Sequence, residues 1–132
     1  YRAMLRGDCS FMANHDWTED VFGEYYRSNL VTALKPKLIV DYVREALVYP
    51  HGNVRITFDK KLSTCYNTLD MFADDAHYSP IYSREIILEV KYDNYLPASI
   101  HAVIQGLNAT RQSVSKYIIC SDKLLEVKTH GF

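Results

Sequence analysis

Three segments of the chain are rich in apolar and aromatic residues that favour strands, and strict apolar–polar alternation in the second has the period of two typical of a β-strand; together they predict three β-strands. The segments are residues 38–44, 54–59 and 85–92. In the second segment, successive side chains must point to opposite faces of a sheet. Its two faces carry Val54, Ile56 and Phe58 on one side and Arg55, Thr57 and Asp59 on the other. The sequence therefore predicts a sheet with one apolar face, which we expect to pack on helices, and one charged face.

Other segments follow a helical period or carry turn residues. Apolar residues recur at three- and four-residue intervals in 17–34 and again in 97–107, which predicts two amphipathic helices. Residues 50–53 form a turn cluster, and 60–80 are mixed and polar, as in a long connection. The apolar segment 114–120 fits a strand or a helix, and we favour the helix. We expect these helices to pack beside the sheet, which makes an α+β fold.

Composition and charge restrict the class of protein. The chain has 132 residues, 48% hydrophobic and 23% charged, which is typical of one folded domain and excludes a disordered chain. Fifteen Lys and Arg against sixteen Asp and Glu give a net charge of −1, so no overall basic field favours nucleic acid. No apolar run is long enough for a membrane span. Cys9, Cys65 and Cys120 are odd in number and widely spaced, which predicts free buried thiols and a cytoplasmic protein.

The charged face has two interpretations. It is either simply solvated, as most charged strand faces are, or it lines the inside of a curved sheet or barrel. In the second case cationic side chains would bind phosphate oxygens and a carboxylate would hold a divalent metal ion. The residues that such a site would use are Arg44, Arg55, Glu89, Lys91 and Lys116.

Four segments in chain order carry a family resemblance. They are PKLIVDYVREA at 36–46, NVRITFD at 53–59, ILEVKY at 87–92 and SKY at 115–117. In order and spacing they resemble the successive motifs of the VTC-type polyphosphate polymerase domain, over residues 35 to 117. Each motif alone is a weak signal, but four in sequence are specific.

The resemblance implies a triphosphate tunnel metalloenzyme, in which an antiparallel β-barrel encloses a tunnel lined by basic residues and metal-binding carboxylates. The sheet would form part of that barrel, with helices 17–34 and 97–107 packed outside. Carried over by position, the catalytic residues are Arg44, Arg55 and Lys116, and the metal ligand is Glu89. The implied substrate-binding residues are Tyr42, Arg44, Arg55, Lys91, Ser115 and Lys116.

The implied activity is metal-dependent transfer of the γ-phosphate of ATP onto a growing inorganic polyphosphate chain, with Mn²⁺ or Mg²⁺ as the cofactor. The R-x-R pair and further basic residues of the family's N-terminal half have no counterpart here. We therefore expect residues 1–132 to be the C-terminal portion of the domain, with a preceding segment or a second copy completing the tunnel. Two alternatives remain: a triphosphate hydrolase with the same tunnel, and a non-catalytic module that binds polyphosphate or other polyanions.

Overall fold

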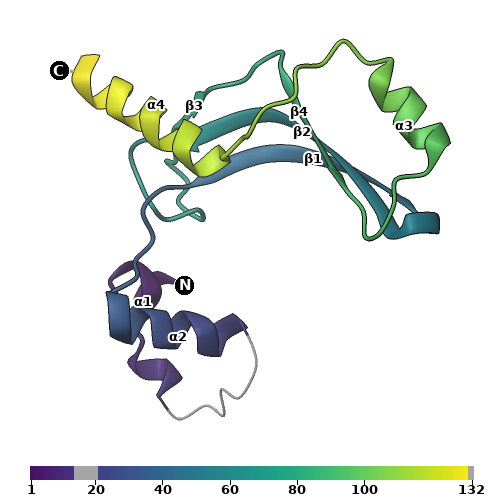
Figure 1. The fold of residues 1–132 in the computed structure, drawn as a ribbon. Helices are drawn as coiled ribbons and strands as arrows, with labels where there is room; N and C mark the ends of the chain where they lie inside the picture. Colours follow the sequence, from purple (N-terminus) through teal and green to yellow (C-terminus); the bar gives the residue numbers. More distant parts are fainter. Residues whose placement is uncertain (14–20, 131–132) are drawn as a thin grey trace. The chain divides into compact units, whose positions relative to one another are not determined.

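The computed structural model describes residues 1–13 and 21–130, and the chain divides into two compact units. The first unit comprises Tyr1–Ile39 and Cys65–His77, and the second comprises Val40–Thr64 and Tyr78–Phe132. Every candidate site residue belongs to the second unit, as does the sheet apart from Cys65 at the end of its longest strand. Figure 1 shows the strands and helices of both units.

The first unit is mainly helical. It contains helix α1 (Arg2–Leu5), a short 3-10 turn η1 (Ser10–Met12) and helix α2 (Val21–Thr32). The hydrophobic period predicts a helix over 17–34; residues 17–20 lie outside the described part, and α2 confirms the helix from residue 21 onward. Because α2 and the sheet belong to different units, its packing outside the sheet stays a prediction.

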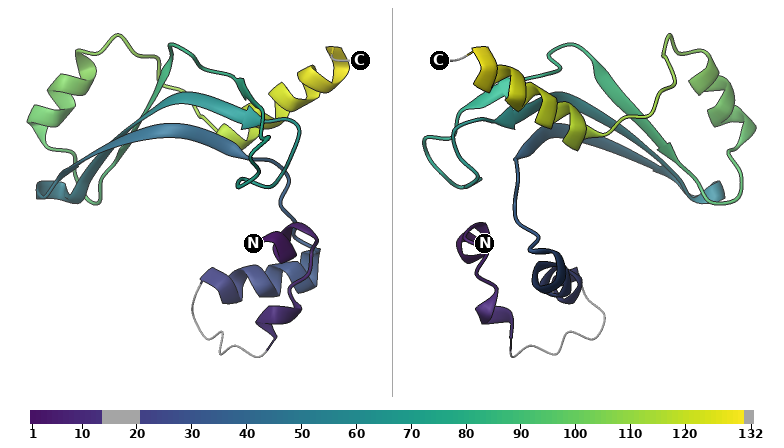
Figure 2. Two further views of the ribbon diagram at one scale, coloured as in Figure 1. Left: turned by 180° about the vertical axis from the view of Figure 1, so that it is seen from behind. Right: turned by 60° about the vertical axis from the view of Figure 1, so that its left-hand side comes forward.

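The second unit is built around one long central strand. The strands are β1 (Val40–Tyr49), β2 (Val54–Cys65), β3 (Tyr78–Pro80) and β4 (Ile86–Lys91). β2 pairs antiparallel with β1 along one edge and antiparallel with β4 along the first half of the other edge. The short strand β3 pairs with β2 as well. All three predicted strands are present, and β1 and β2 curve along their length (Figure 2).

The strand β2 is longer than predicted, because residues 60–65 continue it instead of forming a connection. The register between β1 and β2 shifts at this point: Val43 lies opposite Lys60, whereas Asp41 lies opposite Ser63. Lys61 adopts a left-handed backbone with φ of 54°, so an extra residue bulges from β2. Leu62–Cys65 are buried at every position, and this part of the strand has no alternation that a sequence pattern could reveal.

Two helices follow the sheet in the chain. Helix α3 (Ala98–Gln105) confirms the second predicted helix, and helix α4 (Lys116–His130) confirms the helical choice for the segment near 114–120. Cys120 of α4 is fully buried, with its Sγ 3.9 Å from the carbonyl oxygen of Ser63. The core of the second unit therefore lies where α4 meets the bulged end of β2.

The apolar face of the sheet is not covered as predicted. Val43 and Leu47 of β1 and Ile86 of β4 are 52–60% exposed, and α3 has no buried residue. The prediction that α3 packs on this face is wrong, because α3 stands clear of the sheet near the end where β1 and β2 turn (Figure 1).

The α+β class is confirmed, with an antiparallel sheet and flanking helices. The sheet is open, since β1 is an edge strand in the described part of the chain, and the tunnel barrel is not confirmed. All three cysteines are free and buried, as predicted. Within residues 1–13 and 21–130 no helix has the length and apolar character needed to cross a membrane.

Candidate functional site

The strand register brings the predicted site residues onto one face of the sheet. Side chains of directly paired residues lie on the same face of an antiparallel sheet. Arg44 and Asp59 are paired across β1 and β2, while Glu89 and Lys91 of β4 are paired with Thr57 and Arg55 of β2. We use the name charged face for Tyr42, Arg44, Arg55, Thr57, Asp59, Glu89 and Lys91. The parity predicted from the sequence is confirmed for all three strands.

Asp59 is the electrostatic centre of the charged face. Its side chain is fully buried, and its two oxygens accept hydrogen bonds from Nε and Nη2 of Arg44 at 2.6 and 2.7 Å. Nζ of Lys116, the first residue of α4, lies 2.7 Å from Asp59 Oδ2. Asp59 on β2 therefore connects β1 with the start of α4. It fixes the positions of Arg44 and Lys116, two residues that were predicted to bind phosphate.

The pKa values of this cluster follow from these bonds. The Arg44 hydrogen bonds lower the pKa of Asp59 to about 2 against an ordinary value of 3.8; burial opposes the shift, and Lys116 adds to it. The same hydrogen bonds raise the pKa of Arg44 above its ordinary value. Asp59 is thus a permanent anion at neutral pH.

Tyr42 and Ser115 complete this end of the site. Two cations lie over the Tyr42 ring, whose centroid is 5.1 Å from the Arg44 guanidinium carbon and 5.2 Å from Lys116 Nζ. Ser115 caps helix α4: its Oγ accepts a hydrogen bond from the Ile118 N–H at 3.4 Å, and its carbonyl accepts one from Ile119 at 3.1 Å. Among the described residues no group accepts the Ser115 hydroxyl proton, so the hydroxyl can donate it to a ligand.

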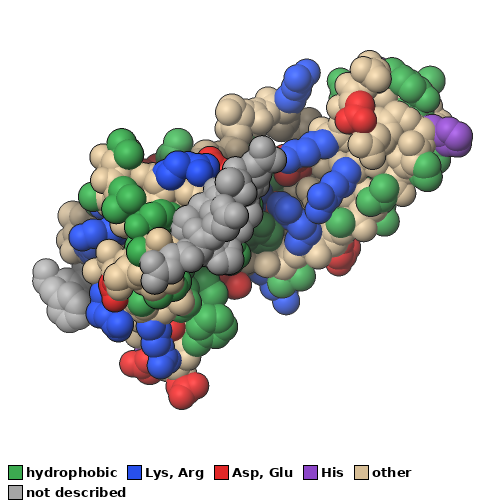
Figure 3. Space-filling model, turned by 90° about the horizontal axis from the view of Figure 1, so that it is seen from below, with side chains coloured by type: hydrophobic (Ala, Val, Ile, Leu, Met, Phe, Trp, Pro, Cys, Tyr) green, Lys and Arg blue, Asp and Glu red, His purple; other side chains and the backbone are tan. Residues whose placement is uncertain are grey.

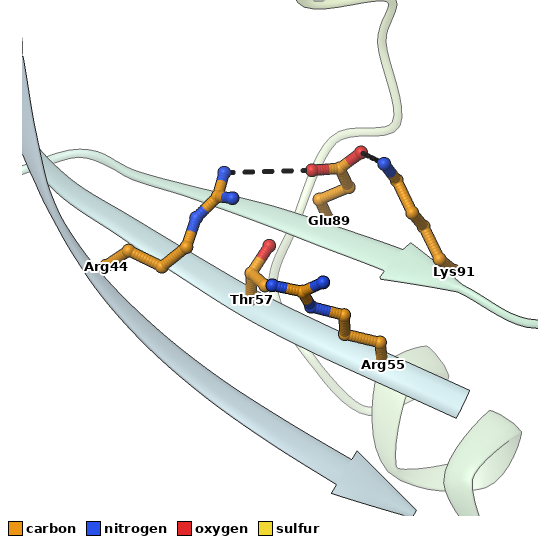
Figure 4. Close-up of a pocket in the computed structure, with 5 residues that line it drawn as sticks. All are labelled: Arg44, Arg55, Thr57, Glu89 and Lys91. Carbon is orange, nitrogen blue, oxygen red and sulfur yellow. Dashed lines mark ion pairs between the residues drawn. The ribbon is translucent and has the colours of Figure 1, made fainter. Parts of the chain in front are cut away.

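The other end of the charged face is a hollow of about 50 Å³ that Arg44, Arg55, Thr57, Glu89 and Lys91 line (Figure 4). We call it the charged hollow. Lys91 Nζ lies 3.2 Å from Glu89 Oε1, and Arg44 Nη2 lies 4.0 Å from Glu89 Oε2. Arg55 forms no ion pair with any described residue, so its guanidinium can bind a ligand without first breaking a bond.

Cations outnumber carboxylates at this site. Arg44, Arg55, Lys91 and Lys116 face the carboxylates of Asp59 and Glu89. In the space-filling view, Lys and Arg side chains gather on the face displayed, with single Asp and Glu side chains among them (Figure 3). A local anion site is therefore compatible with a chain whose net charge is only −1.

The carboxylates limit how a metal ion could bind. Residues 1–13 and 21–130 contain no group of three His, Cys, Asp or Glu side chains placed to hold a metal ion. Asp59 has both oxygens engaged, whereas the Glu89 side chain is 39% exposed at the charged hollow. Mg²⁺ is commonly held by one or two carboxylates together with substrate phosphates. The Glu89 carboxylate is therefore suited to bind a metal ion whose other ligands are the phosphate oxygens of a substrate.

Sequence reasoning missed Asp59 and Thr57 as site residues. The signal for both was present, since they alternate with Arg55 on the charged face of the same strand. The contacts of Asp59 with β1 and α4 depend on residues 15 and 57 positions away, and no local pattern reveals them. Ser115 and Tyr42, the other two predicted substrate-binding residues, lie beside Lys116, and neither lines the charged hollow.

The fold and the site define a class: an α+β unit with a cation-rich face on a curved, open antiparallel sheet. The VTC domain family model matches residues 6–125, which is most of the chain. The chain therefore belongs to the VTC domain family, and this membership indicates a function related to polyphosphate. No curated protein and no solved structure matches the chain significantly.

Proposed function

We propose that this chain forms a phosphate-binding wall of a polyphosphate polymerase, which transfers the γ-phosphate of ATP onto the end of a polyphosphate chain. The observation that carries the proposal is the convergence of Arg44, Arg55, Lys91 and Lys116 on one face, beside the carboxylate of Glu89. Family membership supports polyphosphate as the substrate class. This support is separate from the first, because the family match does not depend on the side-chain geometry.

In this reaction a terminal oxygen of polyphosphate attacks the γ-phosphorus of ATP. A new P–O bond forms, the bond from the γ-phosphorus to the β–γ bridging oxygen breaks, and ADP leaves. The work of the protein is to position the phosphates and to stabilise their negative charge. Arg55 is suited to bind two oxygens at once, because a planar guanidinium donates in parallel.

The remaining residues have supporting roles in the proposal. Glu89 would hold a divalent metal ion, which supplies Lewis-acid neutralisation of the phosphate oxygens when bound. Lys91, beside Glu89, would contact the same phosphates, and Arg44 and Lys116 would extend the cationic surface along the chain of phosphates. No side-chain nucleophile is required, so the Ser115 hydroxyl would donate a hydrogen bond to phosphate while it caps α4.

Binding is the direct test. Isothermal titration calorimetry of the chain with inorganic polyphosphate should show saturable binding. The affinity should fall as the salt concentration is raised. Arg55→Ala should weaken it by about 10- to 100-fold, the equivalent of losing a charge-assisted hydrogen bond of roughly 1.5–3 kcal/mol. Arg55→Lys should also weaken it, since it keeps the charge and loses the planar donors.

Lys60→Ala is the matched control. Lys60 lies on β2 with its side chain on the opposite face, paired with Glu45 at 2.7 Å, and it carries the same charge as Arg55. Its loss should change polyphosphate affinity by no more than about twofold, because it alters only long-range, screened electrostatics. Equal affinity in wild type and Arg55→Ala would show that the charged face is merely solvated.

Turnover separates the three activities that the family resemblance allows. Radiolabelled ATP with Mn²⁺ or Mg²⁺ should yield polyphosphate from a polymerase, free phosphate from a hydrolase and neither from a binding module. The sheet is open and offers one wall, so we expect this chain alone to bind polyphosphate and to synthesise it poorly, because acceptor and donor need fixed geometry. Rapid synthesis by the isolated chain would contradict that expectation.

A further inference from the structure

Thr57 occupies the central position of the charged face. On β2 it lies between Arg55 and Asp59, and it is paired with Ala46 of β1 on one side and Glu89 of β4 on the other. Its neighbour Ala46 has a minimal side chain with no polar atom that could bond the Thr57 hydroxyl. In Figure 4 the Thr57 hydroxyl points into the charged hollow, between Arg44, Arg55 and Glu89.

The Thr57 hydroxyl is buried and has no hydrogen-bond partner among the described residues. The residue is only 4% exposed, and its Oγ1 is inaccessible to bulk solvent. Buried hydroxyl groups are nearly always hydrogen-bonded, because leaving one unpaired forfeits its bonds to water. An unpaired buried hydroxyl that lines a binding hollow therefore points to a partner that comes with the ligand.

The neighbouring acceptors are already engaged. Both oxygens of Asp59 accept bonds from Arg44, and Oδ2 also faces Lys116. Glu89 is paired with Lys91 at 3.2 Å. The hollow of about 50 Å³ is several times the ~10–15 Å³ that one water needs, so it has room for a small oxyanion.

The surrounding charge identifies that oxyanion. Arg44, Arg55 and Lys91 line the hollow against one carboxylate, Glu89, which favours a ligand rich in anionic oxygen acceptors. We propose that Thr57 is a ligand-binding residue whose hydroxyl donates a hydrogen bond to a non-bridging phosphate oxygen held beside Arg55. This inference rests on the proposed function and adds a residue that the motif resemblance does not assign.

The proposal predicts that removing the Thr57 hydroxyl lowers the affinity for the ligand and does not lower the stability of the fold. Thr57→Val keeps the shape of the side chain and removes only the hydroxyl. If the hydroxyl bonds a ligand and no protein group, Thr57→Val should unfold in urea at the same midpoint as wild type or a higher one. A hydroxyl with a structural role would give the opposite result, a lower midpoint.

Affinity is then measured by calorimetry with two probes, inorganic polyphosphate and ATP. Thr57→Val should bind at least one of them about three- to tenfold more weakly, as expected for the loss of one hydrogen bond. Thr57→Ser, which keeps the hydroxyl, should stay within about twofold of wild type. Weakening for polyphosphate alone assigns the contact to the chain of phosphates, weakening for ATP alone assigns it to the nucleotide, and weakening for both assigns it to a phosphate position that they share.

The negative outcomes are distinct. Unchanged affinity of Thr57→Val for both probes, together with weakened binding by Arg55→Ala, overturns this inference and leaves the proposed function standing. Equal weakening by Thr57→Val and Thr57→Ser also overturns it, because Thr57→Ser keeps the hydroxyl and loss of the hydroxyl could not then explain the weakening. A wild-type chain that binds neither probe overturns both proposals.

Discussion

Replacing the buried carboxylate of Asp59 tests whether it organises the charged face. Asp59→Asn keeps the size of the side chain and removes the negative charge that Arg44 and Lys116 share at 2.6–2.7 Å. A pKa of about 2 against an ordinary 3.8 corresponds to roughly 2–3 kcal/mol of stabilisation of the folded state by the charged form. We therefore expect Asp59→Asn to lower the free energy of unfolding by about that amount at pH 7.

The same linkage predicts a pH dependence. The pKa of Asp59 is lower in the folded than in the unfolded state, so its contribution is fully present above about pH 5 and is lost as pH falls toward 2. The difference in unfolding free energy between wild type and Asp59→Asn should therefore shrink by roughly 1 kcal/mol between pH 6 and pH 3. Urea unfolding followed by circular dichroism at several pH values measures it.

Glu45→Gln is the control for this experiment. Glu45 pairs with Lys60 at 2.7 Å across the same two strands, but its side chain is 63% exposed. Exposed ion pairs contribute about 0–1 kcal/mol, so this variant should lose little stability. If Asp59→Asn costs no more than Glu45→Gln, or if its cost does not change between pH 6 and pH 3, Asp59 does not hold the site together.

Two further predictions concern the ring beside the cations and the turn before β2. Tyr42→Leu should weaken polyphosphate binding about three- to tenfold, because the aromatic ring positions Arg44 and Lys116. The control Tyr42→Phe keeps the ring and should bind within about twofold of wild type. Equal losses of affinity in the two variants would show that the Tyr42 hydroxyl is responsible. Gly52→Ala should lower the unfolding free energy by about 1–3 kcal/mol in urea, because φ is +77° and a Cβ would lie 2.6 Å from the Tyr95 carbonyl oxygen. Gly106→Ala, with φ of −74° and its nearest contact at 3.4 Å, is the control and should cost much less.

Much of the second unit was predictable from local patterns. Strict alternation in 54–59, and alternation broken only by Ile87 in 85–92, identified these two strands and their charged faces, because a strand that separates two environments must alternate in polarity. Pro97 and the apolar spacing after it identified α3. Arg44, Arg55, Glu89 and Lys91 were predicted to share one face, and the strand register brings them to it.

The sequence by itself thus determined the elements, the parity of each strand and the residues that the charged face presents. Only the tertiary structure decided that β2 continues through a bulge to Cys65. The residues after the bulge are buried on both faces of the strand, so their polarity does not alternate and no sequence pattern marks them as a strand. The tertiary structure alone decided that Asp59 joins β1 to α4 and that the Thr57 hydroxyl has no protein partner in the described residues. Such contacts join positions far apart in the chain, and pairing and burial depend on the assembled neighbours of a residue.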